Sequence, residues 1–191
     1  QNLLKKTPKQ MRALQGSRLS FFFQDPFTYL NPTMTVGGQI IEVYRQHNKV
    51  GKKEAEERAI EIMKMISIPN PEQNMKCYPH QLSGGMRQRI MITMALICDP
   101  KILFADEPTT ALDVTIQAQI IELLHDLKKK IDASIVLITH DMGVVANMAE
   151  RIYVMYAGQI VEHGSSRDIF YHPKHPYTQG LLQSVPRIDG R

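Results

Sequence analysis

The chain has 191 residues, of which 43% are hydrophobic and 22% are charged, and its formal net charge at pH 7 is +4. These values are ordinary for a soluble globular protein and suffice for one domain with a sizeable core, or for most of a larger one. The basic residues are scattered and do not interleave with aromatic residues, which argues against a nucleic-acid partner.

The two cysteines, Cys77 and Cys98, are too few for a disulfide framework or a metal set, so a reducing cytoplasm is the simpler interpretation. The longest apolar run, residues 90–98, is far too short to span a bilayer, and no signal peptide is visible. The first residue is Gln1 and not Met, which suggests a processed, truncated or partial product.

The first third of the chain predicts one strand followed by helices. Residues 1–18 are polar and basic, and Pro8 is expected to break any helix there. Residues 19–23 form an apolar run long enough for a buried strand, with Gln24 at its end. Residues 30–98 show almost no strand signal and predict a helical insert.

Two helices of this insert are predicted from clear signals. The first, which ends before Pro69, has apolar residues at i, i+4, i+7, i+8 and i+11. These are Ala55, Ala59, Ile62, Met63 and Ile66. Residues 70–79 are predicted to be a loop, and Ser83 is a good N-cap for a helix that runs from Met86 to Ile97.

The remainder predicts a parallel α/β core. Residues 102–105 form a short strand with Asp106 at its carboxyl end, and Asp113 can cap the next helix. Residues 134–139 form a second buried strand, followed by His140. The order of strand, helix, strand and helix favours parallel strands. A hairpin that turns at Ala157-Gly158 and a helix near residues 179–184 complete the chain.

Asp106 and Glu107 are candidates for a metal ligand and a general base. They stand at the carboxyl edge of a strand, where α/β sheets present ligand-binding groups. A carboxylate there can hold Mg²⁺, usually through water, and the adjacent Glu107 can polarise an attacking water. An ordinary Asp-Glu-Pro turn is the alternative, but the preceding strand and residues 109–113 favour the functional interpretation.

Ser83, Gly84 and Gly85 are candidates for an anion site. Backbone N–H groups at a helix N-terminus bind anions, and glycine lets a phosphate approach closely. Arg87 and Arg89 are expected to add positive charge nearby. The alternative is a common glycine-rich turn into a helix.

His140 and Gln24 complete the candidate residues. His140 follows a buried strand and can donate a hydrogen bond to a terminal phosphate, although a lone histidine is more often structural. Gln24 can bond an attacking or metal-bound water. The loop that usually cradles phosphates, G-x-x-x-x-G-K-[ST], does not occur in the 191 residues, because the single Gly-Lys pair, Gly51-Lys52, is followed by Lys53.

Five ordered segments resemble the ATPase subunit of an ABC transporter, where they correspond to the Q-loop, signature, Walker B, D-loop and H-loop. They are Phe23-Gln24-Asp25-Pro26, Leu82-Ser83-Gly84-Gly85-Met86, Asp106-Glu107-Pro108, Ala111-Leu112-Asp113 and Thr139-His140-Asp141. The tail His175-Pro176-Tyr177-Thr178 is similar to the dipeptide/oligopeptide and nickel permease branch of that family.

The resemblance implies an incomplete P-loop NTPase core with parallel strands, a helical subdomain and a C-terminal permease-type extension. It divides the chain into four segments. These are a core remnant at 1–24, a helical subdomain with the signature at 25–98, the ATPase core at 99–163 and the extension at 164–191.

The resemblance also implies ATP and Mg²⁺ as ligands, held between two ATPase domains packed head to tail. Asp106 would assist Mg²⁺ together with Gln24, Glu107 would be the general base, and His140 and Gln24 would contact the γ-phosphate region. Three residues of the signature, Ser83, Gly84 and Gly85, would touch the partner's nucleotide. Asp113 would communicate across the interface.

The implied function is ATP hydrolysis that powers peptide import from the cytoplasmic face of the membrane. The implied partners are a second ATPase subunit, transmembrane permease subunits and, indirectly, a solute-binding protein. Two departures are noted: Met86 replaces the commoner glutamine of the signature, and the N-terminal lobe with its phosphate loop is missing. We therefore expect this chain alone to bind ATP weakly, hydrolyse little, expose a strand edge and be unstable.

Three alternatives remain open. The chain can be a non-catalytic, truncated paralogue that offers its signature to an intact partner, or it can serve nickel rather than peptide import. A soluble ABC ATPase that acts on DNA is the third, and the permease-like tail argues against it.

Overall fold

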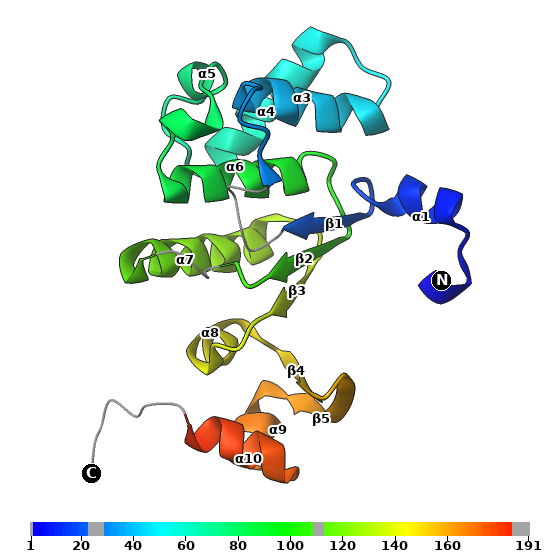
Figure 1. Ribbon diagram of the computed structural model, residues 1–191, viewed down its shortest axis with the longest axis vertical. Helices are drawn as coiled ribbons and strands as arrows, with labels where there is room; N and C mark the ends of the chain where they lie inside the picture. The colour runs from blue at the N-terminus through cyan, green and yellow to red at the C-terminus, as the bar shows by residue number, and fades with distance from the viewer. Residues whose placement is uncertain (1, 23–28, 109–112, 185–191) are drawn as a thin grey trace. The chain divides into compact units, whose positions relative to one another are not determined.

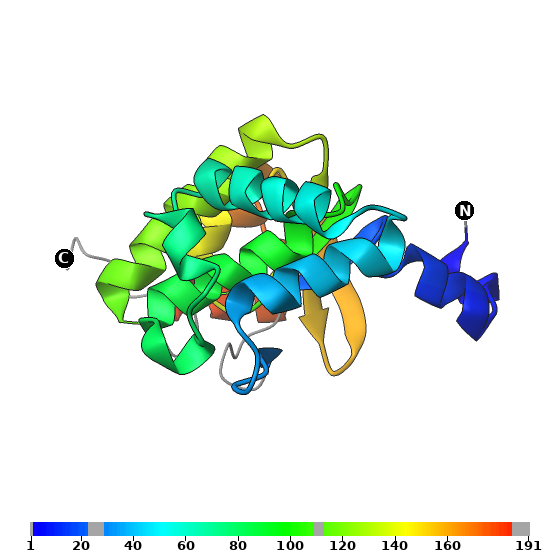
Figure 2. The same ribbon diagram turned by 90° about the horizontal axis from the view of Figure 1, so that it is seen from above.

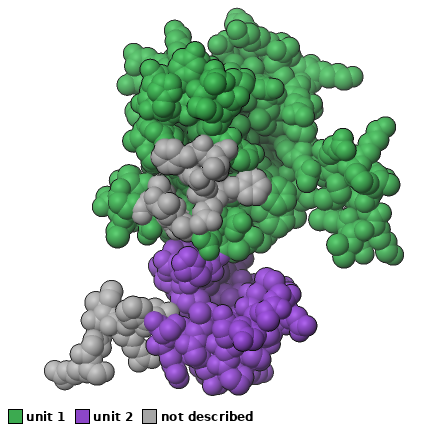
Figure 3. Space-filling view, viewed as in Figure 1, with its two compact units in different colours: residues 1–138 green, residues 139–191 purple. Residues whose placement is uncertain are grey.

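The computed structural model describes residues 2–22, 29–108 and 113–184 (Figure 1). The chain forms two compact units, residues 1–138 and residues 139–191 (Figure 3), and each has its own sheet. The division into four segments stays a prediction. No helix in the described ranges combines the length and the apolar character that crossing a bilayer requires.

Among its described residues, the first unit has a sheet of three parallel strands in the order β1-β2-β3. The strands are β1 (Leu19–Phe22), β2 (Ile102–Asp106) and β3 (Ser134–Ile138). Phe21 pairs with Phe104, and Phe104 pairs with Val136, so β2 lies in the centre. The parallel α/β core predicted from the order of the elements is confirmed.

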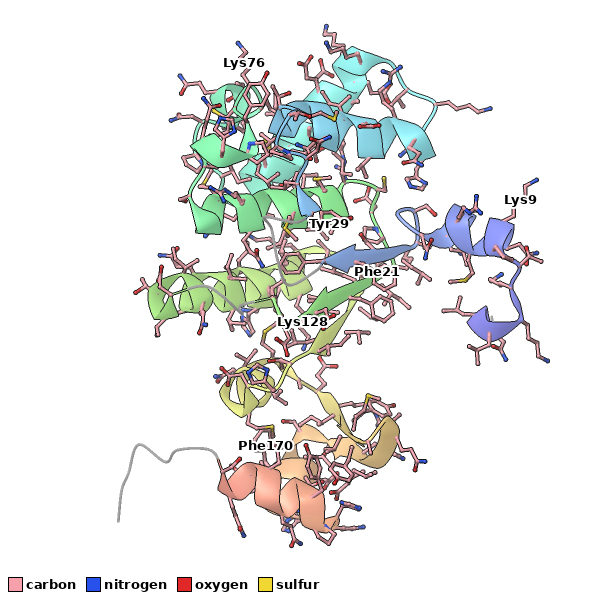
Figure 4. The ribbon with its side chains drawn as sticks, in the orientation of Figure 1. Lys9, Phe21, Tyr29, Lys76, Lys128 and Phe170 are labelled. Carbon is pink, nitrogen blue, oxygen red and sulfur yellow. The ribbon has the colours of Figure 1, made fainter. Side chains whose placement is uncertain are left out.

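The two faces of this sheet differ in exposure. Phe22, Leu103 and Ala105 are buried, as expected for alternate residues that face covering helices. Phe21, which stacks on Phe104 with ring centroids 4.8 Å apart, keeps 37% of its surface exposed (Figure 4), and Val136 keeps 40%. One face therefore forms the core of the unit, and the other leaves apolar surface in contact with solvent.

The segment before the sheet corrects one expectation. Pro8 does not break a helix but begins one, α1 (Pro8–Leu14), which follows the short 3-10 helix η1 (Leu3–Lys5). Proline is favoured at the first helical position because its missing N–H would have no helical partner there. Thr7 caps this helix by accepting the Gln10 N–H at 3.3 Å.

The insert between β1 and β2 is helical in its described part, as predicted. Figure 2 shows its three main helices lying side by side. They are α3 (Val36–His47), α4 (Lys52–Met65) and α6 (Gly84–Leu96). The apolar positions predicted to face the core from α4 and its end are all buried.

The stretch predicted as a loop contains α5 (Pro71–Asn74), and η2 (Pro79–Gln81) begins at its end. The loop prediction was therefore wrong in part. Each of these short helices begins at a proline, whose restricted φ suits the first helical turn.

Helix α7 (Val114–Lys130) connects β2 to β3 as a crossover between parallel strands. Its buried stripe consists of Ile120, Leu123, Leu124 and Leu127. Asp113 caps it by accepting the Ile116 N–H at 2.9 Å, which confirms the predicted cap.

In its described part, residues 139–184, the second unit combines a hairpin with three helices. Its elements are α8 (Met142–Met148), β4 (Arg151–Tyr156), β5 (Gln159–Ser165), α9 (Ser166–Tyr171) and α10 (Pro176–Gln183). Ala157 and Gly158 both have positive φ, 48° and 79°, as a tight hairpin turn requires. Ile152, Val154 and Ile169 form a small core. Helix α9 was not predicted, and α10 begins earlier than expected because Pro176 occupies its first turn.

Glu162 of β5 anchors the segment that leads into α10. Its carboxylate accepts the Lys174 N–H at 2.7 Å and the His175 N–H at 3.1 Å. The Thr178 hydroxyl also interacts with it, although too loosely for a well-formed hydrogen bond. Burial raises the pKa of Glu162, but these interactions outweigh it, so the pKa lies below the usual glutamate value.

Replacing Glu162 with glutamine is expected to weaken the attachment of α10 in a pH-dependent way. Because its pKa is lower in the folded than in the unfolded chain, Glu162 stabilises the fold above a pH of about 4.3. This contribution is lost as the pH falls through the folded-state pKa. The urea midpoints of wild type and Glu162→Gln should therefore differ at pH 7 and converge at lower pH. Glu56→Gln, at an exposed position of α4, is the control, and equal midpoints at pH 7 would contradict the prediction.

Candidate functional site

The signature turn, residues 83–85, lies at the N-terminus of α6. Ser83 is exposed and has extended backbone angles, and its hydroxyl accepts the Met86 N–H at 3.4 Å. The predicted N-cap is thus confirmed. A helix start of this kind presents N–H groups that lack a partner within the helix, and these groups attract anions.

Gly85 packs the signature turn against α7. A methyl group added at Gly85 would lie 3.1 Å from Ile116 Cγ2 and 3.3 Å from its Cδ1, closer than side chains usually pack. Ile116 belongs to the first turn of α7, which Asp113 caps. The structure therefore brings two of the predicted elements together, the signature turn and the helix start that carries Asp113.

The two arginines that follow, Arg87 and Arg89, donate hydrogen bonds to backbone carbonyl groups. Arg87 Nε donates to Pro79 O at 2.8 Å and to Leu82 O at 3.0 Å. Arg89 Nη1 donates to Ile66 O at 2.6 Å. Both side chains thus bind backbone of the segment between α4 and α6. That their positive charge also serves the anion site stays a prediction.

Asp106 and Glu107 stand at the carboxyl end of β2, as predicted. Asp106 is half-buried and is the last residue paired with β3. Glu107 has a positive φ of 43°, and its N–H donates to Ile138 O at 2.8 Å. A left-handed conformation is uncommon for a residue with a side chain and breaks the alternation of the strand at this point.

A contact that the sequence did not predict joins α6 to this loop. The Gln88 side chain is fully buried, and its Nε2 donates to the carbonyl oxygen of Pro108 at 2.6 Å. Pro108 directly follows Glu107. The one sequence signal was a polar residue on a helix whose other buried positions are mostly apolar.

The remaining predicted site residues lie in the second unit or outside the described residues. His140 belongs to the second unit, where Thr139 Oγ1 accepts the Asp141 N–H at 3.0 Å. Asp141 in turn caps α8 through the Gly143 N–H at 2.8 Å. Gln24 and the D-loop residues before Asp113 lie outside the described residues. The catalytic and binding roles of all these residues stay predictions.

A separate cavity of about 300 Å³ lies between α4 and the segments that flank β2 and β3. Most of its charged residues form ion pairs: Arg58 with Asp99 at 2.6 Å and Lys101 with Asp132 at 2.6 Å. None of the predicted site residues lines it. Because its charges largely cancel, it offers no evident anion site.

Asp106 is the candidate ligand for Mg²⁺ at the edge of the sheet. The described ranges contain no group of three or more His, Cys, Asp or Glu side chains that could hold a metal ion. Mg²⁺ retains several waters and often takes only one or two carboxylates. Asp106, at the edge of the sheet, suits such a role.

Comparison with known proteins identifies relatives along the whole chain. The ABC transporter family profile matches residues 2–110, and the profile of the oligopeptide/dipeptide transporter C-terminal region matches residues 161–191. The chain is 56% identical over 188 residues to the dipeptide transport ATP-binding protein DppD of Bacillus subtilis, and 58% identical over 187 residues to DppD of Haemophilus influenzae. These alignments cover 98% of this chain but 56% and 57% of the relatives, so it spans just over half their length.

Solved structures show the same fold. Dimeric MJ0796, a bacterial ABC transporter cassette, is 28% identical with a TM-score of 0.73, covering 86% of this chain and 70% of that chain. A dimeric post-hydrolysis state of the ATP-binding cassette MJ0796, bound to ADP and Pi, matches with a TM-score of 0.72 at 28% identity, covering 85% of this chain and 69% of that chain. The α/β architecture is thus that of an ABC ATPase cassette.

Proposed function

Because this chain belongs to the ABC transporter family, we propose that it binds and hydrolyses ATP as part of a subunit that powers peptide import. Relatives named as dipeptide and oligopeptide transport ATP-binding proteins support the peptide branch, as does the match at residues 161–191. The observation that carries the proposal is the geometry of the signature turn, an exposed, serine-capped helix start whose Gly85 fits closely against Ile116.

In this proposal the signature turn binds the phosphates of a nucleotide held by a partner subunit. Ser83 and the backbone N–H groups of Gly84 and Gly85 would donate hydrogen bonds to phosphate oxygens, and the start of α6 would favour their negative charge. Asp113, at the start of α7, would face the same partner.

The edge of the sheet would supply the groups for hydrolysis. Asp106 would hold Mg²⁺ through water, and the bound ion would neutralise charge on the phosphate oxygens. Glu107 would accept the proton of the water that attacks the γ-phosphate. His140 would donate a hydrogen bond to the terminal phosphate, and Gln24 would orient the water.

The implied assembly has two ATPase subunits and transmembrane permease subunits, with a solute-binding protein acting through them. The chain would sit at the cytoplasmic face of the membrane. The dimeric state of the similar MJ0796 cassette supports the pairing of two ATPase subunits.

The test is a mixed sample that contains this chain and DppD of Bacillus subtilis in equal amounts. We expect its MgATP hydrolysis to exceed the sum of the two proteins measured separately, because the chain adds a second signature turn. Additive rates without association of the two proteins would contradict the proposal. Labelled-ATP binding that rises without extra hydrolysis would instead favour a non-catalytic interaction partner, and salt-dependent DNA binding would favour an ATPase that acts on DNA.

A further inference from the structure

We propose that the basic segment of this chain, residues 2–18, binds directly to an anionic lipid surface. This inference goes beyond the proposed function, which attributes no lipid contact to the chain, and it does not depend on ATP hydrolysis. It is carried by the charge of the segment, by the direction of its basic side chains and by two exposed leucines.

The first observation is the one-sided charge of the basic segment. It contains five of the 23 lysines and arginines of the chain and no aspartate or glutamate. The whole chain has a net charge of +4, so the remainder is nearly neutral. None of the five basic side chains forms an ion pair with another described residue, which leaves them available to a negatively charged partner. The five are Lys5, Lys6, Lys9, Arg12 and Arg18.

The second observation is the direction of the basic side chains on α1. Met11 and Leu14 are half-buried, so they form the inner side of the helix. Lys9 and Arg12 are three residues apart and lie on the opposite side, since each residue turns the helix by about 100°. Both are exposed, and Lys9 points away from the first unit in Figure 4. The outer face of α1 is therefore basic, and Figures 1 and 2 show the helix at the edge of this unit.

The third observation favours a lipid surface over a nucleic acid. Leu3 and Leu4, directly before Lys5, are both exposed, and Leu4 keeps 96% of its surface in contact with solvent. Aliphatic side chains beside basic ones suit a membrane interface, where the apolar groups enter the acyl boundary and the basic groups contact phosphates. A nucleic acid would offer the leucines no such partner, and the segment has no aromatic residue to stack on bases.

The basic segment is folded and attached at both ends of its helices. Asn2 Oδ1 accepts the Leu4 N–H at 3.0 Å, which fixes the turn that carries the exposed leucines. After α1, the Arg18 N–H donates to Leu14 O at 2.8 Å, and Arg18 O accepts the Lys101 N–H at 2.9 Å next to β2. Binding to a surface therefore requires little additional ordering of the chain, which lowers its entropic cost.

The first experiment measures sedimentation of the purified chain with lipid vesicles in the absence of nucleotide. Vesicles of phosphatidylcholine alone are compared with vesicles of three parts phosphatidylcholine and one part phosphatidylglycerol. We expect the chain to bind the anionic vesicles about ten-fold or more tightly than the neutral ones. Binding should weaken as the salt concentration rises to about 0.5 M, because the ions screen the charges.

The second experiment reverses two charges of the segment. The double variant Lys5→Glu with Lys9→Glu should bind anionic vesicles about 25-fold or more weakly, because each basic residue near such a surface contributes about five-fold. Lys52→Glu with Lys53→Glu is the matched control, since both lysines are exposed in the first turn of α4 and the net charge changes equally. We expect the control to weaken binding less than about three-fold, because its charges lie outside the segment.

The third experiment tests the leucines with Leu4→Ser. Because Leu4 is exposed, the substitution removes no packing within the chain. It should weaken binding to anionic vesicles about five-fold or more, since the apolar group no longer enters the interface. Val114→Ser, at another exposed apolar residue in the first turn of α7, should leave vesicle binding unchanged.

Three outcomes would overturn the proposal. They are equal binding to neutral and anionic vesicles, equal losses for the two lysine pairs, and unchanged vesicle binding in Leu4→Ser. If the last result came with binding to duplex DNA that Lys5→Glu with Lys9→Glu abolishes, the segment would be assigned to a nucleic acid instead. The vesicle assay contains no nucleotide, so its failure would leave the proposed function intact. Absence of added hydrolysis in the mixed sample would likewise leave the lipid result standing.

Discussion

Replacing Gly85 with aspartate is expected to reduce ATP hydrolysis in the mixed sample to the sum of the separate rates. Two effects act together. The added Cβ would lie 3.1 Å from Ile116 Cγ2, so the Ile116 side chain must move by a few tenths of an ångström, and the close fit of the signature turn against α7 would be disturbed. The carboxylate would also repel phosphate at a helix start that otherwise attracts anions.

A matched control is available at Gly51, the N-cap of α4. An added Cβ there meets nothing within 4 Å, and no side chain caps this helix. Gly51→Asp places the same charge at another helix N-terminus, where it should be neutral or slightly stabilising, by a few tenths of a kcal/mol. Two outcomes would show that the proposed role of the signature turn is wrong. One is that Gly85→Asp keeps the full hydrolysis in excess of the sum of the separate rates. The other is that Gly51→Asp loses this excess equally.

Replacing Leu103 with alanine is expected to destabilise the chain by about 3 kcal/mol, within the range of about 2–5 kcal/mol found for buried leucines. Leu103 is fully buried in β2, the central strand, so the substitution leaves a cavity between the sheet and its covering helices. Urea unfolding followed by circular dichroism measures the change as a shift of the midpoint.

Val136→Ala provides the comparison on the same sheet. Val136 lies on the neighbouring strand β3 with 40% of its surface exposed, so its truncation should change the free energy of unfolding by less than about 1 kcal/mol. Equal decreases in the free energy of unfolding for Leu103→Ala and Val136→Ala would show that the exposed face of the sheet is covered in solution. That result would contradict the division of the sheet into a buried and an exposed face.

The sequence predicted the elements that depend on local chemistry. Hydrophobic periodicity located α4, and short side chains that cap helices located the starts of α6 and α7 at Ser83 and Asp113. The predictions around Pro8 and Pro71 were wrong because each of these prolines begins a helix. The same covalent restriction on φ can begin or break a helix, and only the neighbouring residues decide between the two.

By itself, the sequence determined the family, the order of the candidate site segments and the strand end that carries Asp106 and Glu107, because each is encoded in adjacent residues. The tertiary structure alone decided which of these segments meet. It packs Gly85 on Ile116, directs Arg87 and Arg89 to backbone carbonyls, and joins Gln88 to Pro108 across twenty residues. Such contacts depend on how helices pack on a sheet, and spacing along the chain carries no direct record of that packing.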